Sequence, residues 1–145
     1  MILAALLAAN PGAAPGIDAG VPSDPAISAE PNPRELEHEA MTQLKSIYVS
    51  EKAYFAEYDR WGIDFVQIGF VPDALCPDGA RQKIKVREGP SVAVGCHFSY
   101  SVELHKELGF VATARGEVGR TRGRSFRVVG LGPSSGVVEE LPARR

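Results

Sequence analysis

Apolar residues that recur at steps of three and four predict one long helix in the first half of the chain. Its start has a capping-box pattern, because Asn32 can accept from free backbone amides, Pro33 suits the first turn and Glu35 can return a bond to the cap. We expect this helix to extend over 34–59 and to end before Gly62. The residues of its expected buried stripe are Leu36, Ala40, Leu44, Ile47, Tyr48, Glu51, Tyr54, Phe55 and Tyr58.

A strict alternation of polar and apolar residues predicts strands in the second half of the chain. Three segments, 97–104, 110–115 and 124–129, alternate in this way, and glycine-containing turns separate them. A weaker fourth segment covers 81–87, and the residues after Gly136 are either a short strand or a frayed end. Short strands at hairpin spacing indicate an antiparallel meander.

The predicted sheet must bury its apolar side against another element, and the helix is the partner that the sequence offers. Phe110, Ala112 and Ala114 fall on one face of their strand, and the alanines leave room for a helix to approach closely. The predicted fold class is therefore α+β, with one long N-terminal helix packed on a three- to four-stranded antiparallel meander. We assign this domain to 34–145.

The segment before the helix, 1–33, is predicted to be a signal peptide followed by a linker. Residues 1–9 are almost purely apolar, but a helix needs about 20 apolar residues to span a bilayer, whereas about 7 to 15 suit a signal peptide. We therefore expect no transmembrane anchor; the alternative is a start codon that lies inside a longer gene. The prolines of 11–33 indicate an extended tether.

Composition fits one globular domain, and the charge is distributed unevenly. The chain has 145 residues, 44% of them hydrophobic, and a formal charge of −2, which gives no overall attraction to polyanions. Residues 1–60 hold 4 basic and 9 acidic side chains (−5), whereas 61–145 hold 12 and 9 (+3). A cationic surface for nucleic acid, an acidic polysaccharide or an acidic protein is one interpretation, and charge protection of a solvated sheet edge is the other. The residues concerned are Arg81, Lys83, Lys85, Arg87, Arg115, Arg120, Arg122, Arg124 and Arg127.

The order of these parts resembles the type IV pilins and pseudopilins. The helix segment 44–58, the loop 61–70 with its Ile-Gly-Phe end, and the three clear strands are similar to the family's headpiece, so the resemblance covers roughly 36–130. The family's leader, its cleavage point with a following glutamate, and its apolar stalk have no counterpart in 1–39. The resemblance therefore implies a headpiece without its stalk.

From this resemblance we expect a non-enzymatic, exported protein in the periplasm or outside the cell. Its implied partners are proteins, such as subunits of a type IV pilus or a type II secretion apparatus. The alternative function is a soluble binding module that uses the cationic surface described above.

The two cysteines, Cys76 and Cys96, are disulfide candidates. Their even number and an exported location favour a bridge, and pilin-like headpieces often have one in this part. The alternative is a pair of free thiols in a cytosolic protein. A bridge would join the loop after the helix to the first clear strand.

The sequence offers no catalytic or cofactor motif. The histidines fall in three different elements without metal-ligand spacing, and Cys96-His97 lacks the preceding cysteine of a haem attachment site. Loop aspartates match no calcium loop, and the aromatic run Tyr54, Phe55 and Tyr58 is interpreted as core rather than as a ligand site. We therefore predict no enzyme activity, metal or cofactor.

Overall fold

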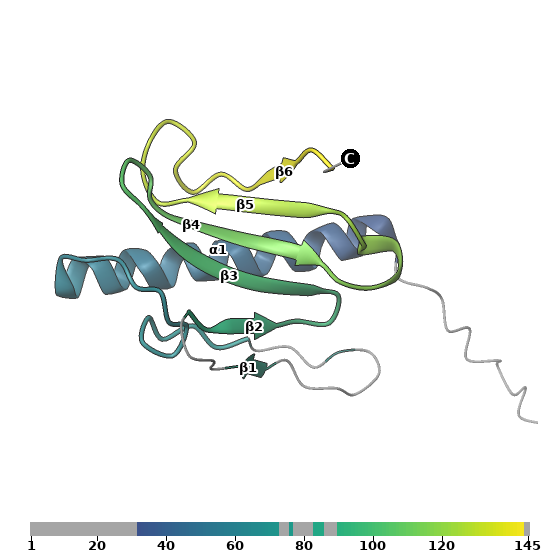
Figure 1. Ribbon diagram of the computed structural model, residues 1–145, viewed down its shortest axis with the longest axis horizontal. Coiled ribbons are helices and arrows are strands. Elements are labelled where there is room, and N and C mark those ends of the chain that lie inside the picture. The colour runs from purple at the N-terminus through teal and green to yellow at the C-terminus, as the bar shows by residue number, and fades with distance from the viewer. Residues whose placement is uncertain (1–31, 73–75, 77–82, 86–89, 144–145) are drawn as a thin grey trace, which may run out of the picture.

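The computed structural model describes residues 32–72, 76, the backbone of 83–85, and 90–143 (Figure 1). These described residues form one long helix, six strands and one short 3-10 turn. The elements are α1 (Pro33–Tyr58), β1 (Lys83–Lys85), β2 (Val92–Val94), β3 (Phe98–His105), β4 (Gly109–Gly116), η1 (Gly119–Thr121), β5 (Ser125–Val129) and β6 (Glu139–Leu141). Nearly all of the expected signal peptide and linker lies outside the described residues.

The strands form a single antiparallel sheet in which spatial order equals chain order, from β1 to β6. Helix α1 crosses one face of this sheet and contacts β3, β4 and β5 (Figure 1). The α+β prediction of one helix on an antiparallel meander is therefore confirmed. Within the described residues, no helix is both long enough and apolar enough to cross a membrane.

The ends of α1 follow the predicted capping chemistry. The Asn32 side chain accepts from the Arg34 amide at 3.1 Å, and the Glu35 carboxylate accepts from the Asn32 amide at 3.0 Å. At the other end Asp59 adopts a left-handed conformation (φ 53°), and its amide donates to the Phe55 carbonyl. Both ends are thus set by local interactions.

The core lies between α1 and the sheet, where small side chains allow close approach. Ala112 and Ala114 on β4 and Ala40 on α1 are fully buried, as is Phe110. Burial of each large apolar side chain contributes roughly 1.5–3 kcal/mol to folding. This tight contact confirms the prediction made from the alanines of β4.

Two strands exceed the predicted number. The segment that forms β2 is too short to show an alternating pattern, and it pairs with both β1 and β3. The segment after Gly136 does form a strand, β6, which pairs with β5. Hydrogen bonds to neighbouring strands stabilise these three-residue segments, and a local sequence pattern does not reveal such bonds.

The aromatic run at the end of α1 is only partly core, which corrects the prediction. Tyr54 is buried, but Phe55 is half-buried and Tyr58 is 52% exposed. The helix extends beyond the sheet at this end (Figure 1), so its last turn has less of the sheet to pack against. Tyr58 instead lies against the Tyr54 ring, with 4.7 Å between ring centroids.

Candidate functional site

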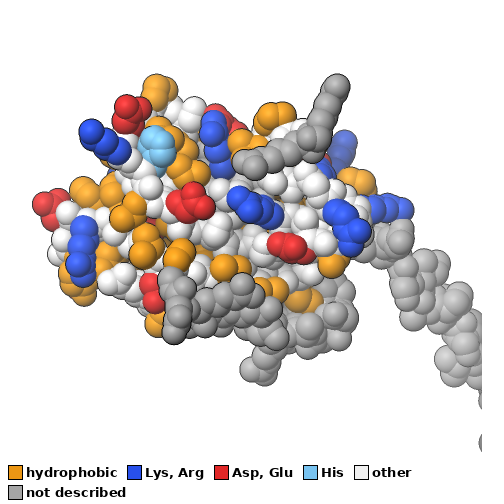
Figure 2. Space-filling model, in the orientation of Figure 1, with side chains coloured by type: hydrophobic (Ala, Val, Ile, Leu, Met, Phe, Trp, Pro, Cys, Tyr) orange, Lys and Arg blue, Asp and Glu red, His pale blue; other side chains and the backbone are white. Residues whose placement is uncertain are grey.

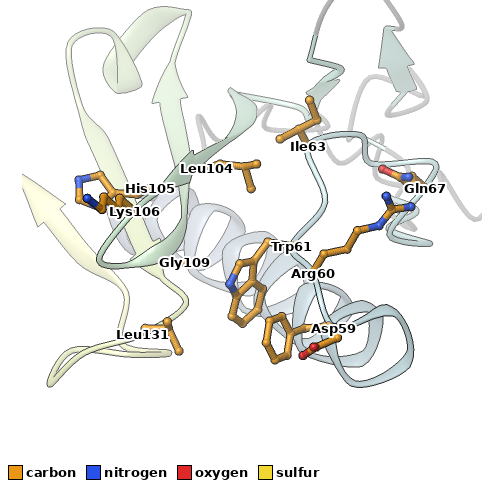
Figure 3. Close-up of a pocket in the computed structure, with 11 residues that line it drawn as sticks. Asp59, Arg60, Trp61, Ile63, Gln67, Leu104, His105, Lys106, Gly109 and Leu131 are labelled. Atoms are coloured by element: carbon orange, nitrogen blue, oxygen red, sulfur yellow. The ribbon is translucent and has the colours of Figure 1, made fainter.

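A hollow of about 630 Å³ lies where the C-terminal end of α1 meets the β3–β4 turn (Figure 3). We call it the aromatic hollow. Three parts of the chain form its walls: the end of α1 with the loop that follows it, the β3–β4 turn, and the segment after β5. Its lining residues are Phe55, Asp59, Arg60, Trp61, Ile63, Gln67, Leu104, His105, Lys106, Gly109 and Leu131.

Stacked aromatic rings support the hollow. The Trp61 ring lies parallel to the Phe55 ring within 25°, with centroids 4.3 Å apart, and it also packs at 5.1 Å against Phe110 in the core. The exposed apolar side chains Leu104 (57% exposed) and Ile63 (42% exposed) stand at its margins. The sheet core therefore continues outward as an apolar surface at this end of the molecule.

A buried carboxylate holds the loop that carries Trp61. Glu51 is fully buried in α1, and its Oε2 accepts from the Gly62 amide at 3.0 Å. Its Oε1 has no hydrogen-bond partner among the described residues. Burial raises the pKa of Glu51 to about 7, because desolvation disfavours the charged form, while the Gly62 bond acts in the opposite direction. This residue therefore links the position of the loop to a titratable group inside the protein.

Gly109 permits the close approach of Trp61 to the β3–β4 turn. It has a φ of +72°, and a Cβ atom placed on it would lie 2.7 Å from Trp61 Nε1. Both the backbone conformation and the available space therefore require glycine.

We predict that Gly109→Ala displaces Trp61 and lowers the free energy of unfolding by about 2 kcal/mol, since a left-handed conformation is strained for alanine and its methyl group collides with the indole. Trp61 is the only tryptophan, so its fluorescence emission should shift to longer wavelength as the ring meets water. Gly69→Ala is the matched control, because Gly69 has a φ of +69° with nothing within 4 Å of a Cβ atom. Equal spectra for the two variants would contradict the assigned contact.

The composition of the aromatic hollow suits the binding of an apolar group. Its lining contains no serine, threonine or cysteine nucleophile, and its polar groups stand beside apolar surface. Within the described part of the chain, no group of three metal-ligating side chains is close enough to hold an ion. The hollow can accept an apolar side chain and offer polar contacts around it.

The predicted disulfide is present and lies next to a second polar cluster. Cys76 and Cys96 are bonded with 5.4 Å between their Cα atoms, which is consistent with a non-reducing compartment. Glu39 of α1 accepts from the Cys96 amide at 2.9 Å, the His97 amide at 3.2 Å and His97 Nδ1 at 2.7 Å. Burial is the main reason that the pKa of Tyr100, whose hydroxyl points at Glu39, lies well above its usual range. We interpret this cluster as structural, because it fastens the helix to the start of β3.

The structure separates the predicted cationic residues into several environments. Arg124 bonds to Glu140 at 2.8 Å and to Glu37 at 2.9 Å, and Arg127 bonds to Glu139 at 3.1 Å. The bond from Arg127 holds the pKa of Glu139 below its usual range. Arg115, Arg120 and Arg122 are exposed, but only Arg115 belongs to a strand.

The four predicted cationic residues of the segment 81–87 are described only in part. Lys83 and Lys85 belong to β1, whose backbone alone is described. Arg81 and Arg87 lie outside the described residues.

Sequence reasoning missed the aromatic hollow, the role of Glu39 and the effect of burial on Glu51. Trp61 was visible only as part of a loop, and the partners of Glu39 lie 57 and 58 residues away along the chain. Glu51 did carry a detectable signal, because a glutamate inside an otherwise apolar stripe must be buried or disturb the packing.

Comparisons with known proteins add no assignment: no protein family matches this chain, and no curated protein or solved structure is significantly similar to it.

Proposed function

We propose that this protein is a non-enzymatic, exported, pilin-like protein that acts through protein contacts in the periplasm or outside the cell. The observation that carries the proposal is the 26-residue helix laid across an antiparallel meander. The disulfide between Cys76 and Cys96 supports an oxidising location. The partners that this proposal names are subunits of a type IV pilus or a type II secretion apparatus.

The aromatic hollow is the contact surface that we assign to this function. Interface centres are typically apolar and aromatic with a polar rim, and the hollow combines Trp61, Leu104 and Leu131 with charged residues at its edge. An apolar side chain of the partner would pack against Leu104 and the Trp61 ring.

Site-specific photo-crosslinking in the native cell tests this function. A photoreactive residue in place of Leu104 should form an adduct with a pilus or secretion subunit, whereas one in place of Val49 should not. Val49 is a matched control because it is 64% exposed on the outer side of α1, away from the hollow. Adducts at Leu104 with unrelated proteins only, or equal adducts at both positions, would contradict the proposed contact.

Cell fractionation tests the exported location separately. The protein should be recovered outside the cytosol, with both cysteines resistant to alkylation until a reductant is added. Recovery in the cytosol with reactive thiols would overturn the exported location.

The alternative binding-module function has less support from the charges. Two arginines of the predicted cationic surface, Arg124 and Arg127, are already paired with glutamates. Arg115, on the sheet face opposite α1, has no ion pair among the described residues.

A further inference from the structure

The sheet face opposite α1 carries a row of polar side chains centred on Arg115. In the strand register Arg115 of β4 lies directly between Ser99 of β3 and Ser125 of β5. Directly paired residues of antiparallel strands point to the same face, with Cβ atoms about 4.5–5.5 Å apart. A guanidinium group is therefore flanked by a hydroxyl group on each side.

Arg115 is available for a ligand, unlike Arg124 and Arg127. It is exposed, and it has no ion pair among the described residues, whereas Arg124 and Arg127 are held by glutamates. The next row of the same face consists of Ser101, Thr113 and Arg127, so it adds two more hydroxyl groups and the arginine that is paired with Glu139.

Two shallow hollows meet at Arg115. One, of about 450 Å³, extends over β2 and β3, and the other, of about 430 Å³, extends toward β6. Arg115 and Glu117 line both hollows. Glu117 accepts a hydrogen bond from the Ser99 hydroxyl, so an acceptor carboxylate is fixed beside the donor guanidinium. Figure 2 shows this helix-free side of the molecule, where acidic and basic side chains are interspersed with uncharged surface.

We propose that this face binds a carboxylated sugar, with its carboxylate on Arg115 and its hydroxyl groups on the surrounding serines and Glu117. A guanidinium group matches a carboxylate with two parallel N–H···O bonds. Serine hydroxyls and the Glu117 carboxylate offer the acceptors that sugar hydroxyl groups require. The ligand is either a free sugar acid or a uronate unit within a polysaccharide. This proposal does not depend on the pilin-like assignment.

The same observations disfavour nucleic acid as the ligand. Binding to nucleic acid relies on several basic side chains along the phosphate backbone and often on aromatic rings for base stacking. Here the two hollows share a single unpaired arginine with an acidic neighbour, and the Tyr100 side chain beside them is buried on the helix side. One unpaired arginine surrounded by hydroxyl groups fits a sugar unit with one carboxylate better than the phosphate backbone of a nucleic acid.

Titration calorimetry with the full chain tests the proposal, using polygalacturonate and free glucuronate as the carboxylated probes. Dextran, dextran sulfate and single-stranded DNA, none of which carries a carboxylate, are the comparison ligands. We expect Arg115→Ala to weaken binding of the carboxylated probe at least tenfold and Arg115→Lys to give a smaller loss, since lysine keeps the charge but not the paired donors. Arg122→Ala is the matched control, because Arg122 is exposed and lines neither hollow.

Each outcome decides the proposal. Binding of polygalacturonate that Arg115→Ala weakens at least tenfold and Arg122→Ala leaves within twofold supports it with a polysaccharide as the source. Binding of glucuronate alone, with the same response to the two variants, supports it with a free sugar acid. Binding of neither probe overturns the site. An equal loss in both alanine variants, or tighter binding of DNA or dextran sulfate than of the carboxylated probes, indicates diffuse charge attraction and also overturns it.

Discussion

Replacing Glu51 with glutamine is expected to stabilise the protein by about 3 kcal/mol at pH 8 and to leave its stability nearly unchanged at pH 4. The folded protein raises the pKa of this carboxyl from 4.5 to about 7, so the native state holds the proton more tightly than the unfolded chain does. Stability from this group is therefore fully present below pH 4.5 and is lost as the pH rises through 7. A rise of the pKa from 4.5 to about 7 corresponds to about 3 kcal/mol.

Urea unfolding of both proteins between pH 4 and pH 8 measures this effect. The difference in unfolding free energy between Glu51→Gln and the natural sequence should grow over the range from 4.5 to 7 and then become constant. Glu57→Gln is the matched control, because Glu57 is exposed on the same helix. Parallel pH profiles for Glu51→Gln and the natural sequence would show that Glu51 does not titrate in this range.

The same titration bears on the aromatic hollow. Gly62, which donates to Glu51, lies between Trp61 and Ile63, and both of these residues line the hollow. Trp61 emission recorded during the pH series therefore reports whether the loop moves when Glu51 changes its charge.

Removal of the disulfide is the second large effect that we expect. Cys76→Ala combined with Cys96→Ala should lower the free energy of unfolding by about 3 kcal/mol, because the bond closes a loop between residues 20 positions apart and so restricts the unfolded chain. Alanine is chosen over serine because Cys76 is buried, and burial of a serine hydroxyl would add a desolvation cost of its own.

Reductant provides an internal control for this prediction. The natural protein unfolded in dithiothreitol should match the double variant, and the double variant should not respond to dithiothreitol. If reduction is verified by alkylation and the unfolding midpoint does not move, the bond contributes nothing to stability. The bond lies beside the cluster of Glu39 and His97, so its loss should also loosen that cluster.

Local patterns predicted the elements whose signals lie within a few residues. The capping box of α1, its end at Asp59 and the three long strands were correctly placed, because caps and alternation depend on near neighbours. The sequence pattern did not indicate β2, and it left the segment of β6 open as a strand or a frayed end. Pairing with neighbouring strands defines both of these short strands.

The pilin-like assignment was made from the order of parts along the chain. It stays a prediction, and the crosslinking and fractionation experiments above are its tests. The disulfide was favoured from the number of cysteines and is present, whereas nine basic residues were grouped by charge without knowledge of their partners. Two of them turn out to be paired with glutamates that follow β5.

The sequence by itself determined the class of this fold, because the apolar stripe of the helix and the apolar face of the sheet are both buried when they pack against each other. It also indicated the helix boundaries and favoured a bridge between the two cysteines, which the structure contains. Only the tertiary structure decided which side chains meet, including Trp61 with Gly109, Glu51 with Gly62, and Arg115 with its flanking serines. The physical reason is that periodicity fixes the face on which a residue lies, whereas strand register and loop path fix its neighbours.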